Sequence, residues 1–230
     1  MATRPVFVPR VDRHRVDECD VEFAWVPGMA KSQAQKCIRS LHAAAQQQLK
    51  VDSVLEISSR SEDPDGVSLS AFNLALDTVV GPAPLECVYQ GSKVFERGGP
   101  FTELLSRKPA EARADERLKT SGRLVGFKYG SEWWELEPKT CFYDWLYLSA
   151  LRNNPVLAKR VISVDAFTYI AFNPEKSLSC QARSAALFAV LVRTDSLGKA
   201  TTSQNAFISA NGQALRLRPI APERSLFAAD

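Results

Sequence analysis

The stretch from Leu69 to Arg97 is the feature that most limits how this chain can fold. It opens with a short S-x-F-N turn and continues into a predicted helix that carries Glu86, Gln90, Lys93 and Arg97. An α-helix turns by about 100° per residue, so side chains spaced four, three and four residues apart return to one face. Almost every other residue of this segment is apolar or small. The sequence therefore predicts a buried helix with one polar edge.

This polar edge has two interpretations. A row of Glu, Gln, Lys and Arg is typical of a solvated helix face, where side chains three or four residues apart stabilise one another weakly. A carboxylate, an amide and an amine in one row would also suit the wall of an active site. Spacing alone favours the solvated face, and the surroundings of the helix must decide between the two.

Composition indicates one domain with a substantial core. The chain has 230 residues, of which 45% are hydrophobic, and a chain of this size can bury a core as a single domain. Its charges nearly balance, with 29 basic against 26 acidic side chains and a net charge of +3. A general electrostatic attraction to nucleic acid is therefore not expected, and contact with DNA would need a local patch.

The cysteines and the N-terminus indicate a cytoplasmic protein. The five cysteines are scattered and odd in number and form no C-x-x-C pair, which suits a reducing compartment. With only two histidines, a zinc site is not expected. The first residues lack the apolar core of a signal peptide, and no run of about 18 apolar residues occurs. We expect no metal, no cofactor and no membrane partner.

The order of predicted elements is that of an α+β domain in which helices dominate and strands are few and short. Residues 1–19 are expected to form an extended N-terminal arm, and residues 20–230 to form one domain with a core at about 54–193. Alternating βαβ units are absent, as are the glycine-rich and nucleophile motifs of common enzyme folds. Strands are expected at Val21–Val26 and Val54–Ser58 and, in the tail, at 206–210 and 214–220. Helices are expected at Ala30–Lys50, Pro109–Thr120, Thr140–Asn153, 155–162 and Ser179–Arg193.

Three further side chains have a structural and a functional interpretation. His42 lies on the first long predicted helix, where a packed or surface histidine is favoured over a ligand. Trp133 and Trp134 lie in an aromatic, loop-like stretch and would either stack on a base or cover the core, with the core favoured.

Several short motifs occur in a defined order along the chain. They are EISSRS at 56–61, LSAFN at 69–73, LECVYQGSK at 85–93, SRKPAEARADER at 106–117 and ALRNNPVLAKRV followed by DAFT at 165. This order resembles that of the NADAR family of YbiA-like N-glycosidases. The match covers about 140 residues, and its specificity comes from the order of the motifs, because each one alone is short. The chain differs from the wider family after position 165, where DAFTYIAFNPEKS replaces the usual Trp-Gly and Gly-Lys-Asn elements. Among these proteins, the chain looks most like the subfamily that accompanies DarT-type toxins as their antitoxin.

The resemblance implies a DNA ADP-ribosyl glycohydrolase that removes ADP-ribose from guanine bases and so reverses a DarT-like toxin. It implies Lys93 as the nucleophile at the anomeric carbon and Glu86 as the group that moves protons, because a departing base needs a proton and a trapped sugar needs a nucleophile. The remaining expected contacts to ADP-ribose come from Gln90, Asn73, Ser70, Arg60, Asp165 and Asn173.

Two alternatives remain open at this point. A binding module would use the same pocket to hold ADP-ribose, or would neutralise a toxin by contact without turnover. An enzyme of the same fold would instead cleave a small ribosylated metabolite. Release of ADP-ribose with excess substrate distinguishes catalysis from binding.

Overall fold

The computed structural model describes residues 1–173 and 179–214. Its main sheet has four strands in the order β2-β1-β9-β3. Strands β1 (Ala2–Arg10) and β2 (Arg15–Phe23) form an antiparallel hairpin around a 3₁₀ turn at Val11–Arg13, whereas β9 (Ala166–Thr168) runs parallel to β3 (Val54–Glu56). The α+β class expected from the sequence is confirmed.

The N-terminal segment is part of this sheet and is not a separate arm. Strand β1 pairs with β2 along its length and with β9 at Val6 and Phe7. Strand β2 crosses the expected boundary between positions 19 and 20. The prediction of an arm over residues 1–19 is therefore corrected. Its Arg and Pro residues interrupt the continuous apolar run that marks a strand buried on both faces.

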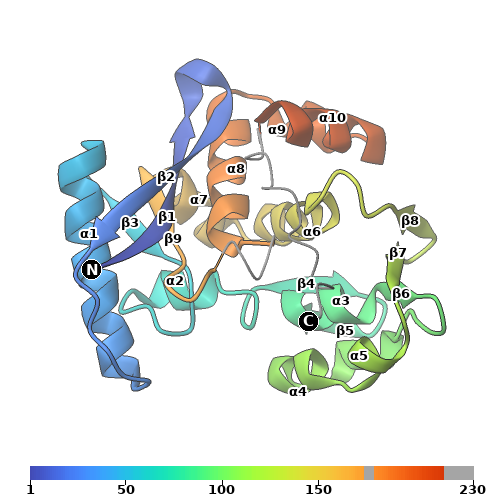
Figure 1. Ribbon diagram of the computed structural model, residues 1–230. Coiled ribbons are helices and arrows are strands. Elements are labelled where there is room, and N and C mark those ends of the chain that lie inside the picture. The colour runs from blue at the N-terminus through green and yellow to red at the C-terminus, as the bar shows by residue number, and fades with distance from the viewer. Residues whose placement is uncertain (174–178, 215–230) are drawn as a thin grey trace, which may run out of the picture.

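The main sheet lies between helices, as Figure 1 shows. Val6 and Val8 of β1 belong to one apolar cluster with Ile38 and Leu41 of α1 (Lys31–Leu49), whereas Phe7 belongs to the main core. Alternate residues of a strand point to opposite faces, so β1 contributes to both layers. The helix predicted at Ala30–Lys50 is confirmed as α1.

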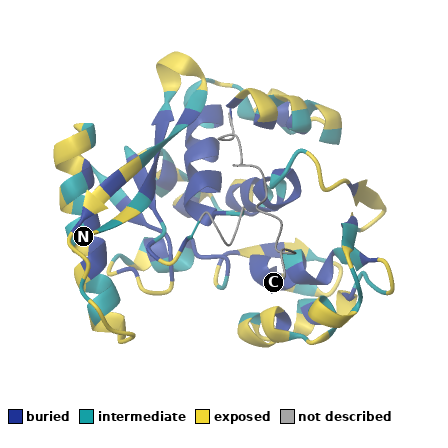
Figure 2. Cartoon of the chain, viewed as in Figure 1, coloured by how far each residue is buried: buried dark blue, intermediate teal, exposed yellow. Residues whose placement is uncertain are grey.

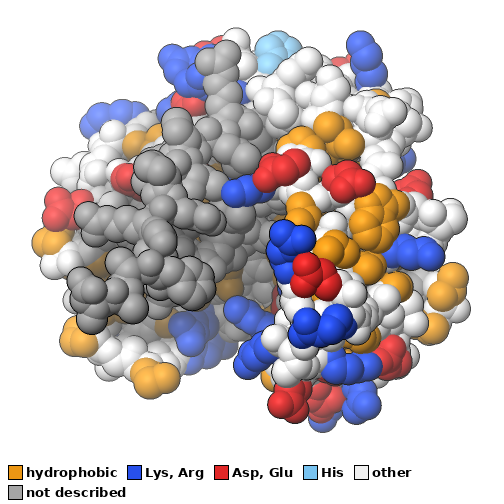
Figure 3. Space-filling model, turned by 45° about the vertical axis from the view of Figure 1, so that its right-hand side comes forward, with side chains coloured by type: hydrophobic (Ala, Val, Ile, Leu, Met, Phe, Trp, Pro, Cys, Tyr) orange, Lys and Arg blue, Asp and Glu red, His pale blue; other side chains and the backbone are white. Residues whose placement is uncertain are grey.

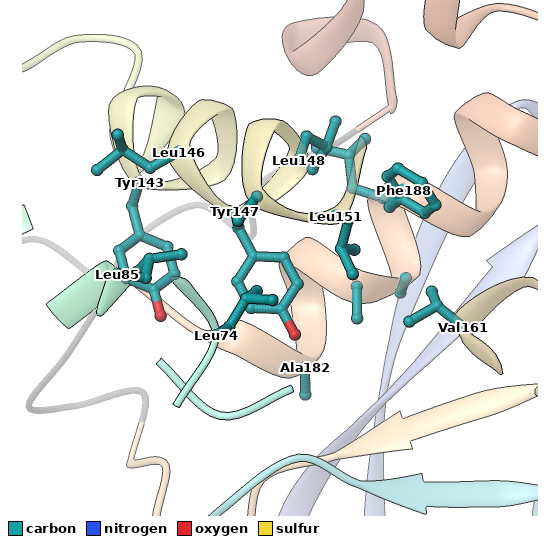
Figure 4. Close-up of a cluster of buried hydrophobic side chains, with 14 of the residues drawn as sticks. Leu74, Leu85, Tyr143, Leu146, Tyr147, Leu148, Leu151, Val161, Ala182 and Phe188 are labelled. Atoms are coloured by element: carbon teal, nitrogen blue, oxygen red, sulfur yellow. The ribbon is translucent and has the colours of Figure 1, made fainter. Parts of the chain in front are cut away.

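The main core is built around three helices that pack against one another. These are α6 (Cys141–Arg152), α7 (Pro155–Ile162) and α8 (Gln181–Arg193), all at or near their predicted positions. Helix α8 is buried along most of its length (Figure 2). In the close-up, Tyr143 and Tyr147 of α6 point toward Leu74 and Leu85, while Leu151 lies near Phe188 of α8 (Figure 4).

The C-terminal part of the described chain is helical. Helices α9 (Leu197–Ala200) and α10 (Gln204–Ala214) follow α8. The strand predicted at 206–210 is therefore wrong, because Phe207 and Asn211, four residues apart, are both buried on one face of α10. The strand predicted at 214–220 lies, apart from Ala214, outside the described residues.

A smaller lobe surrounds the stretch that opened the sequence analysis. Helix α2 (Pro64–Ser68) and the hairpin of β4 (Ala75–Thr78) and β5 (Gly81–Pro84) lead into α3 (Leu85–Gly91). Strands β6 (Lys93–Phe95), β7 (Leu124–Tyr129) and β8 (Glu132–Trp134) form a second sheet. A 3₁₀ helix at Thr102–Ser106 packs against α3, and Leu104 within it is buried.

The helix predicted at Pro109–Thr120 is divided in two. It forms α4 (Pro109–Ala114) and α5 (Arg117–Thr120). Asp115 between them is extended, and its carboxylate accepts hydrogen bonds from the backbone nitrogen and the guanidinium of Arg117. Aspartate competes for backbone donors in this way, and the competition interrupts the helix.

The aromatic stretch is a hairpin and not a loop. Strands β7 and β8 pair antiparallel, with Trp134 opposite Phe127 and Trp133 opposite Lys128. Trp134 is 1% exposed and belongs to the core, as favoured, whereas Trp133 is 41% exposed. Alternation along β8 places the two indoles on opposite faces of the sheet.

None of the helices in the described ranges is long and apolar enough to cross a membrane.

Candidate active site

The helix predicted to end at Arg97 ends at Gly91, which corrects the expected polar stripe. Lys93 begins β6, and Arg97 lies beyond that strand with its guanidinium bonded to the carbonyl oxygen of Thr120. A Cβ on Gly91 would lie 2.7 Å from Leu105 Cδ1, so the chain approaches the next segment closely at this point. The β-branched Val94 and the aromatic Phe95 then favour pairing with β7.

Glu86 and Gln90 remain one turn apart on α3, as predicted. Both side chains are buried, at 8% and 7% exposed. Gln90 Nε2 donates to Glu86 Oε1 at 2.9 Å. Gln90 Oε1 is buried and has no hydrogen-bond partner in residues 1–173 and 179–214. A buried acceptor without a donor costs free energy, so this oxygen is suited to accept a hydrogen bond from a hydroxyl group of a ligand.

Lys93 stays beside these two residues although it has left the helix. Its Nζ lies 4.9 Å from the centre of the Tyr89 ring, on α3 between Glu86 and Gln90. Tyr89 in turn stacks on Phe127 of β7, with ring centres 5.4 Å apart. The aromatic ring thus fixes the position of the amine, because a cation is attracted to the face of a ring at this range.

The surroundings of Lys93 make its amine easier to deprotonate. The pKa of Lys93 is lowered, chiefly because burial disfavours the charged ammonium. The Glu86 carboxylate opposes this shift, and the Arg113 guanidinium adds to it. The cationic influence on Lys93 therefore comes from Arg113, and not from Arg97, which would lie one turn away on the helix predicted from the sequence.

The S-x-F-N turn is joined directly to the start of α3. Ser70 is buried and its hydroxyl donates to the carbonyl oxygen of Val67, while Asn73 Nδ2 donates to Ser70 Oγ at 3.0 Å. The backbone nitrogen of Glu86 donates to the carbonyl oxygen of Ala71 at 2.9 Å. The structure therefore brings Ser70 and Asn73 close to the helix that carries Glu86 and Gln90.

A buried glutamine ties this turn to the end of β3. Gln181, the first residue of α8, accepts a hydrogen bond from the backbone nitrogen of Ala71 at 2.8 Å and donates to the carbonyl oxygen of Ile57. Ile57 immediately precedes the Ser58–Arg60 segment. Gln181 thereby connects two of the motifs, LSAFN and EISSRS, that are separate in the sequence.

Arg60 and Asn173 both follow the carboxyl ends of neighbouring parallel strands. Strand β3 pairs with β9 from Val54 opposite Ala166 to Glu56 opposite Thr168. The chain after each strand therefore leaves the sheet at the same edge. Arg60 is exposed there, and its backbone nitrogen donates to Ser58 Oγ.

Asp165 lies at the opposite end of the same strand pair. It precedes β9, and its carboxylate accepts hydrogen bonds from the backbone nitrogen and the hydroxyl of Ser53, which precedes β3. These bonds help to lower the pKa of Asp165, although partial burial raises it. The geometry therefore gives Asp165 a part in joining the two strands and does not support the predicted contact with ADP-ribose.

Three side chains around the site were missed in the sequence. Glu56 is buried and accepts hydrogen bonds from the Thr168 hydroxyl at 2.7 Å and from the backbone nitrogen of Ile170 at 3.0 Å. The half-buried Tyr89 beneath Lys93 and the buried Gln181 were also not identified. Glu56 opens the EISSRS motif, and Gln181 lies in the helix expected at Ser179–Arg193. Their partners are more than a hundred residues away, which no local pattern indicates.

The site combines the Lys93 amine, whose pKa is lowered, with the Glu86 carboxylate and the unpaired Gln90 amide oxygen, all on α3 and the start of β6. Within the described residues, no group of three or more His, Cys, Asp or Glu side chains is arranged to hold a metal ion. The arrangement suits nucleophilic attack by an amine with proton transfer by a neighbouring carboxylate.

Two comparisons with known proteins complete the description of the site. A family model described as "DarT1-associated NADAR antitoxin" matches residues 2–216. A search of curated proteins finds no match.

Proposed function

Since the chain belongs to the DarT1-associated NADAR antitoxin family, we propose that it is a DNA ADP-ribosyl glycohydrolase that removes ADP-ribose from guanine bases. The observation that carries this proposal is the Lys93 amine, whose pKa is lowered by burial and which lies near the Glu86 carboxylate. An ordinary surface lysine is protonated at neutral pH and cannot attack carbon. A half-buried lysine whose pKa is lowered is more often neutral, and its neutral amine can attack carbon.

The proposed reaction begins when the neutral amine of Lys93 attacks the anomeric carbon of the ribose. The bond from that carbon to guanine breaks, and its electron pair leaves with the base. Glu86 takes a proton from the attacking nitrogen and delivers a proton to the departing guanine. The ribose ring opens to an imine on Lys93, which water hydrolyses to release ADP-ribose and restore the amine.

Gln90 has a defined role in this scheme. Its amide nitrogen is engaged with Glu86, so its orientation is fixed, and its buried oxygen is available. We assign that oxygen to a ribose hydroxyl, because a hydroxyl would supply the missing donor. Such a contact would hold the anomeric carbon against Lys93, and positioning of this kind accelerates reactions strongly.

The rest of ADP-ribose is assigned to the segments that meet at α3 and the edge of β3. Ser70 and Asn73 are proposed to hold a ribose or the diphosphate, and Arg60 supplies an exposed cation for the diphosphate. Asn173 follows β9 at the same edge and is kept as a proposed contact. Asp165 is not included in this pocket.

The proposed substrate is ADP-ribosylated DNA. The proposed protein partner is a DarT-like toxin, which makes this modification and whose effect the glycohydrolase reverses. The cytoplasm is the proposed location. Four of the five cysteines are buried, and no disulfide joins any of the five, all of which lie in the described part of the chain, which suits a reducing compartment.

Substitution of Lys93 tests the proposal. We expect Lys93→Ala to abolish release of ADP-ribose from modified DNA, while Lys128→Ala, which removes an exposed lysine of β7, retains it. Circular dichroism of each variant should match that of the parent. Full activity of Lys93→Ala would reject the mechanism.

A covalent test adds independent evidence. Borohydride reduces an imine to a stable amine, so treatment during turnover should attach ADP-ribose to the parent protein and not to Lys93→Ala. Measurement with excess substrate decides the alternatives. Binding of modified DNA or toxin with no release of ADP-ribose would indicate a binding antitoxin, and turnover of small ribosylated metabolites but not DNA would indicate a metabolic enzyme.

A further inference from the structure

A hollow lies between the end of β8 and the start of α10, apart from the candidate active site. It has a volume of about 260 Å³ and is lined by aromatic and acidic side chains, among them Trp133, Trp134, Glu135 and Glu137. Gln204 of α10 donates to the carbonyl oxygen of Trp133 at 2.8 Å and so joins the two walls. Figure 3 brings forward the right-hand side of Figure 1, where β8 and α10 lie, and shows acidic and hydrophobic side chains beside one another there.

Trp133 is held rigidly although much of it is exposed. Its indole rests on Gly126, where an added Cβ would lie 2.4 Å from Trp133 Cζ2. Its Nε1 donates to Glu135 Oε1 at 2.7 Å. A fixed aromatic face at the surface is costly to leave in water and is typical of a contact residue at protein interfaces.

The two carboxylates are available for an incoming cation. Within the described residues, the Glu137 carboxylate accepts one hydrogen bond, from the backbone nitrogen of Lys139. Within residues 1–173 and 179–214, no ion pair connects Glu135 or Glu137 with a cationic side chain. The hollow therefore carries negative charge that the described chain does not neutralise.

We propose that this hollow binds an arginine side chain presented by a partner protein. A guanidinium is flat, stacks on aromatic faces and donates several hydrogen bonds to carboxylates. Trp133 supplies the face, and Glu135 and Glu137 supply the carboxylates. The same carboxylates would repel DNA phosphates, so a protein partner is favoured over nucleic acid.

This proposal does not depend on the glycohydrolase activity, because none of these residues belongs to the candidate active site. A toxin of the type with which the family is associated is the natural partner to consider, since an antitoxin must act in its presence. The hollow would then add contact with the toxin to the repair of its product.

Titration of the isotope-labelled full chain with short peptides tests the proposal, with the indole resonance of Trp133 as the readout. Acetyl-Gly-Arg-Gly-amide should shift this resonance in a saturable manner at millimolar concentration. The lysine peptide should bind about tenfold more weakly because it lacks the planar fork. The peptide with neutral citrulline in place of arginine should not bind.

Matched variants complete the test. The double substitution Glu135→Gln and Glu137→Gln should weaken binding of the arginine peptide at least about tenfold. Glu132→Gln, which removes one exposed carboxylate of β8 outside the hollow, should leave binding unchanged. Release of ADP-ribose should be the same for all of these proteins. Equal responses to the three peptides, or shifts produced by a short DNA duplex and not by the arginine peptide, would overturn the proposal.

Discussion

Lys93 combines two opposing influences, and their balance determines when its amine is neutral. Burial and the Arg113 guanidinium lower its pKa, whereas the Glu86 carboxylate raises it. Glu86 thus has two effects, since it stabilises the protonated amine before reaction and accepts a proton during it. The pH dependence of the reaction separates these effects.

We expect single-turnover release of ADP-ribose to rise with pH as Lys93 loses its proton, with a midpoint below the pKa of an ordinary lysine. Glu86→Gln removes the charge that raises the pKa of Lys93, so the midpoint should move to lower pH. Its plateau rate should fall by about 10²- to 10⁴-fold, because proton transfer is lost. Arg113→Gln should move the midpoint to higher pH and leave the plateau unchanged. A shift of both midpoints in one direction would contradict this assignment.

At the scale of single elements, the long helices and the short strand β3 were predictable, and most of the other short elements were not. Helices α1, α6, α7 and α8 have sustained periodicity or clear starting signals, such as the cap by which Asn154 accepts from the nitrogen of Leu157. Strands β1 and β6 are decided by pairing with β2, β9 and β7. Pairing between distant segments is invisible to a local pattern, so the boundary between α3 and β6 was missed.

The same limit applies to the candidate site. Glu86 and Gln90 were predicted as neighbours because a helix sets their spacing, and that spacing is confirmed. The predicted proximity of Lys93 came from the wrong element, although the tight passage at Gly91 still places the amine beside α3. Asp165 was grouped with the site by sequence order, whereas the strand register places it at the other end of β9.

Helix α2 provides a test of close packing between elements. A Cβ on Gly66 would lie 2.1 Å from the carbonyl oxygen of Glu56, which belongs to the backbone and cannot easily move. We expect Gly66→Ala to lower the free energy of unfolding in urea by about 1–3 kcal/mol, as overpacking does. It should also weaken binding of ADP-ribose, because Arg60 lies between these two elements.

Gly198→Ala is the matched control for this substitution. Position 198 lies in α9, and an added Cβ there meets no atom within 4 Å. The free energy of unfolding should change by less than about 1 kcal/mol, in the stabilising direction, because alanine favours helix. Equal effects at the two positions would show that α2 does not pack closely on β3.

At the scale of the whole molecule, single buried polar groups connect the main sheet, the helical core and the small lobe. Gln181 of α8 connects Ala71 with Ile57. Gln181→Leu should leave a buried N–H and a buried carbonyl without partners, at a cost of about 1–3 kcal/mol for each group. Binding of ADP-ribose should weaken as well, because the turn of Ser70 loses its attachment.

Gln48→Leu is the control for this change, since it removes one exposed side-chain hydrogen bond to the carbonyl oxygen of Glu22. Its free energy of unfolding should stay within about 0.5 kcal/mol of the parent. If Gln181→Leu behaved like this control in both assays, Gln181 would have no part in joining the segments.

A second connection runs from α1 to the sheet and makes the stability of the fold depend on pH. His42 Nε2 lies 2.9 Å from Thr168 Oγ1, and the Thr168 hydroxyl donates to Glu56. The Thr168 oxygen is therefore the acceptor for a neutral His42. Burial lowers the pKa of His42 from 6.5 to about 4, although the Glu62 carboxylate opposes the shift.

The sign of the effect follows from proton binding. Between pH 6.5 and about 4 the unfolded chain protonates His42 and the folded protein does not. Unfolding therefore takes up a proton in this range, and stability falls as the pH falls. This stability is fully present above pH 6.5. The loss on lowering the pH reaches at most about 3 kcal/mol, since each pKa unit corresponds to about 1.4 kcal/mol.

The difference in unfolding free energy between the parent and His42→Gln isolates this term. Glutamine keeps a donor for Thr168 and does not titrate, and the contribution of Glu56 is present in both proteins. We expect the parent to lose stability relative to the variant as the pH is lowered from 6.5 to 4, measured by urea unfolding at closely spaced pH values. Parallel curves would mean that His42 is as free to protonate in the folded protein as in the unfolded chain, and its contact with Thr168 would then have no part in joining α1 to the sheet.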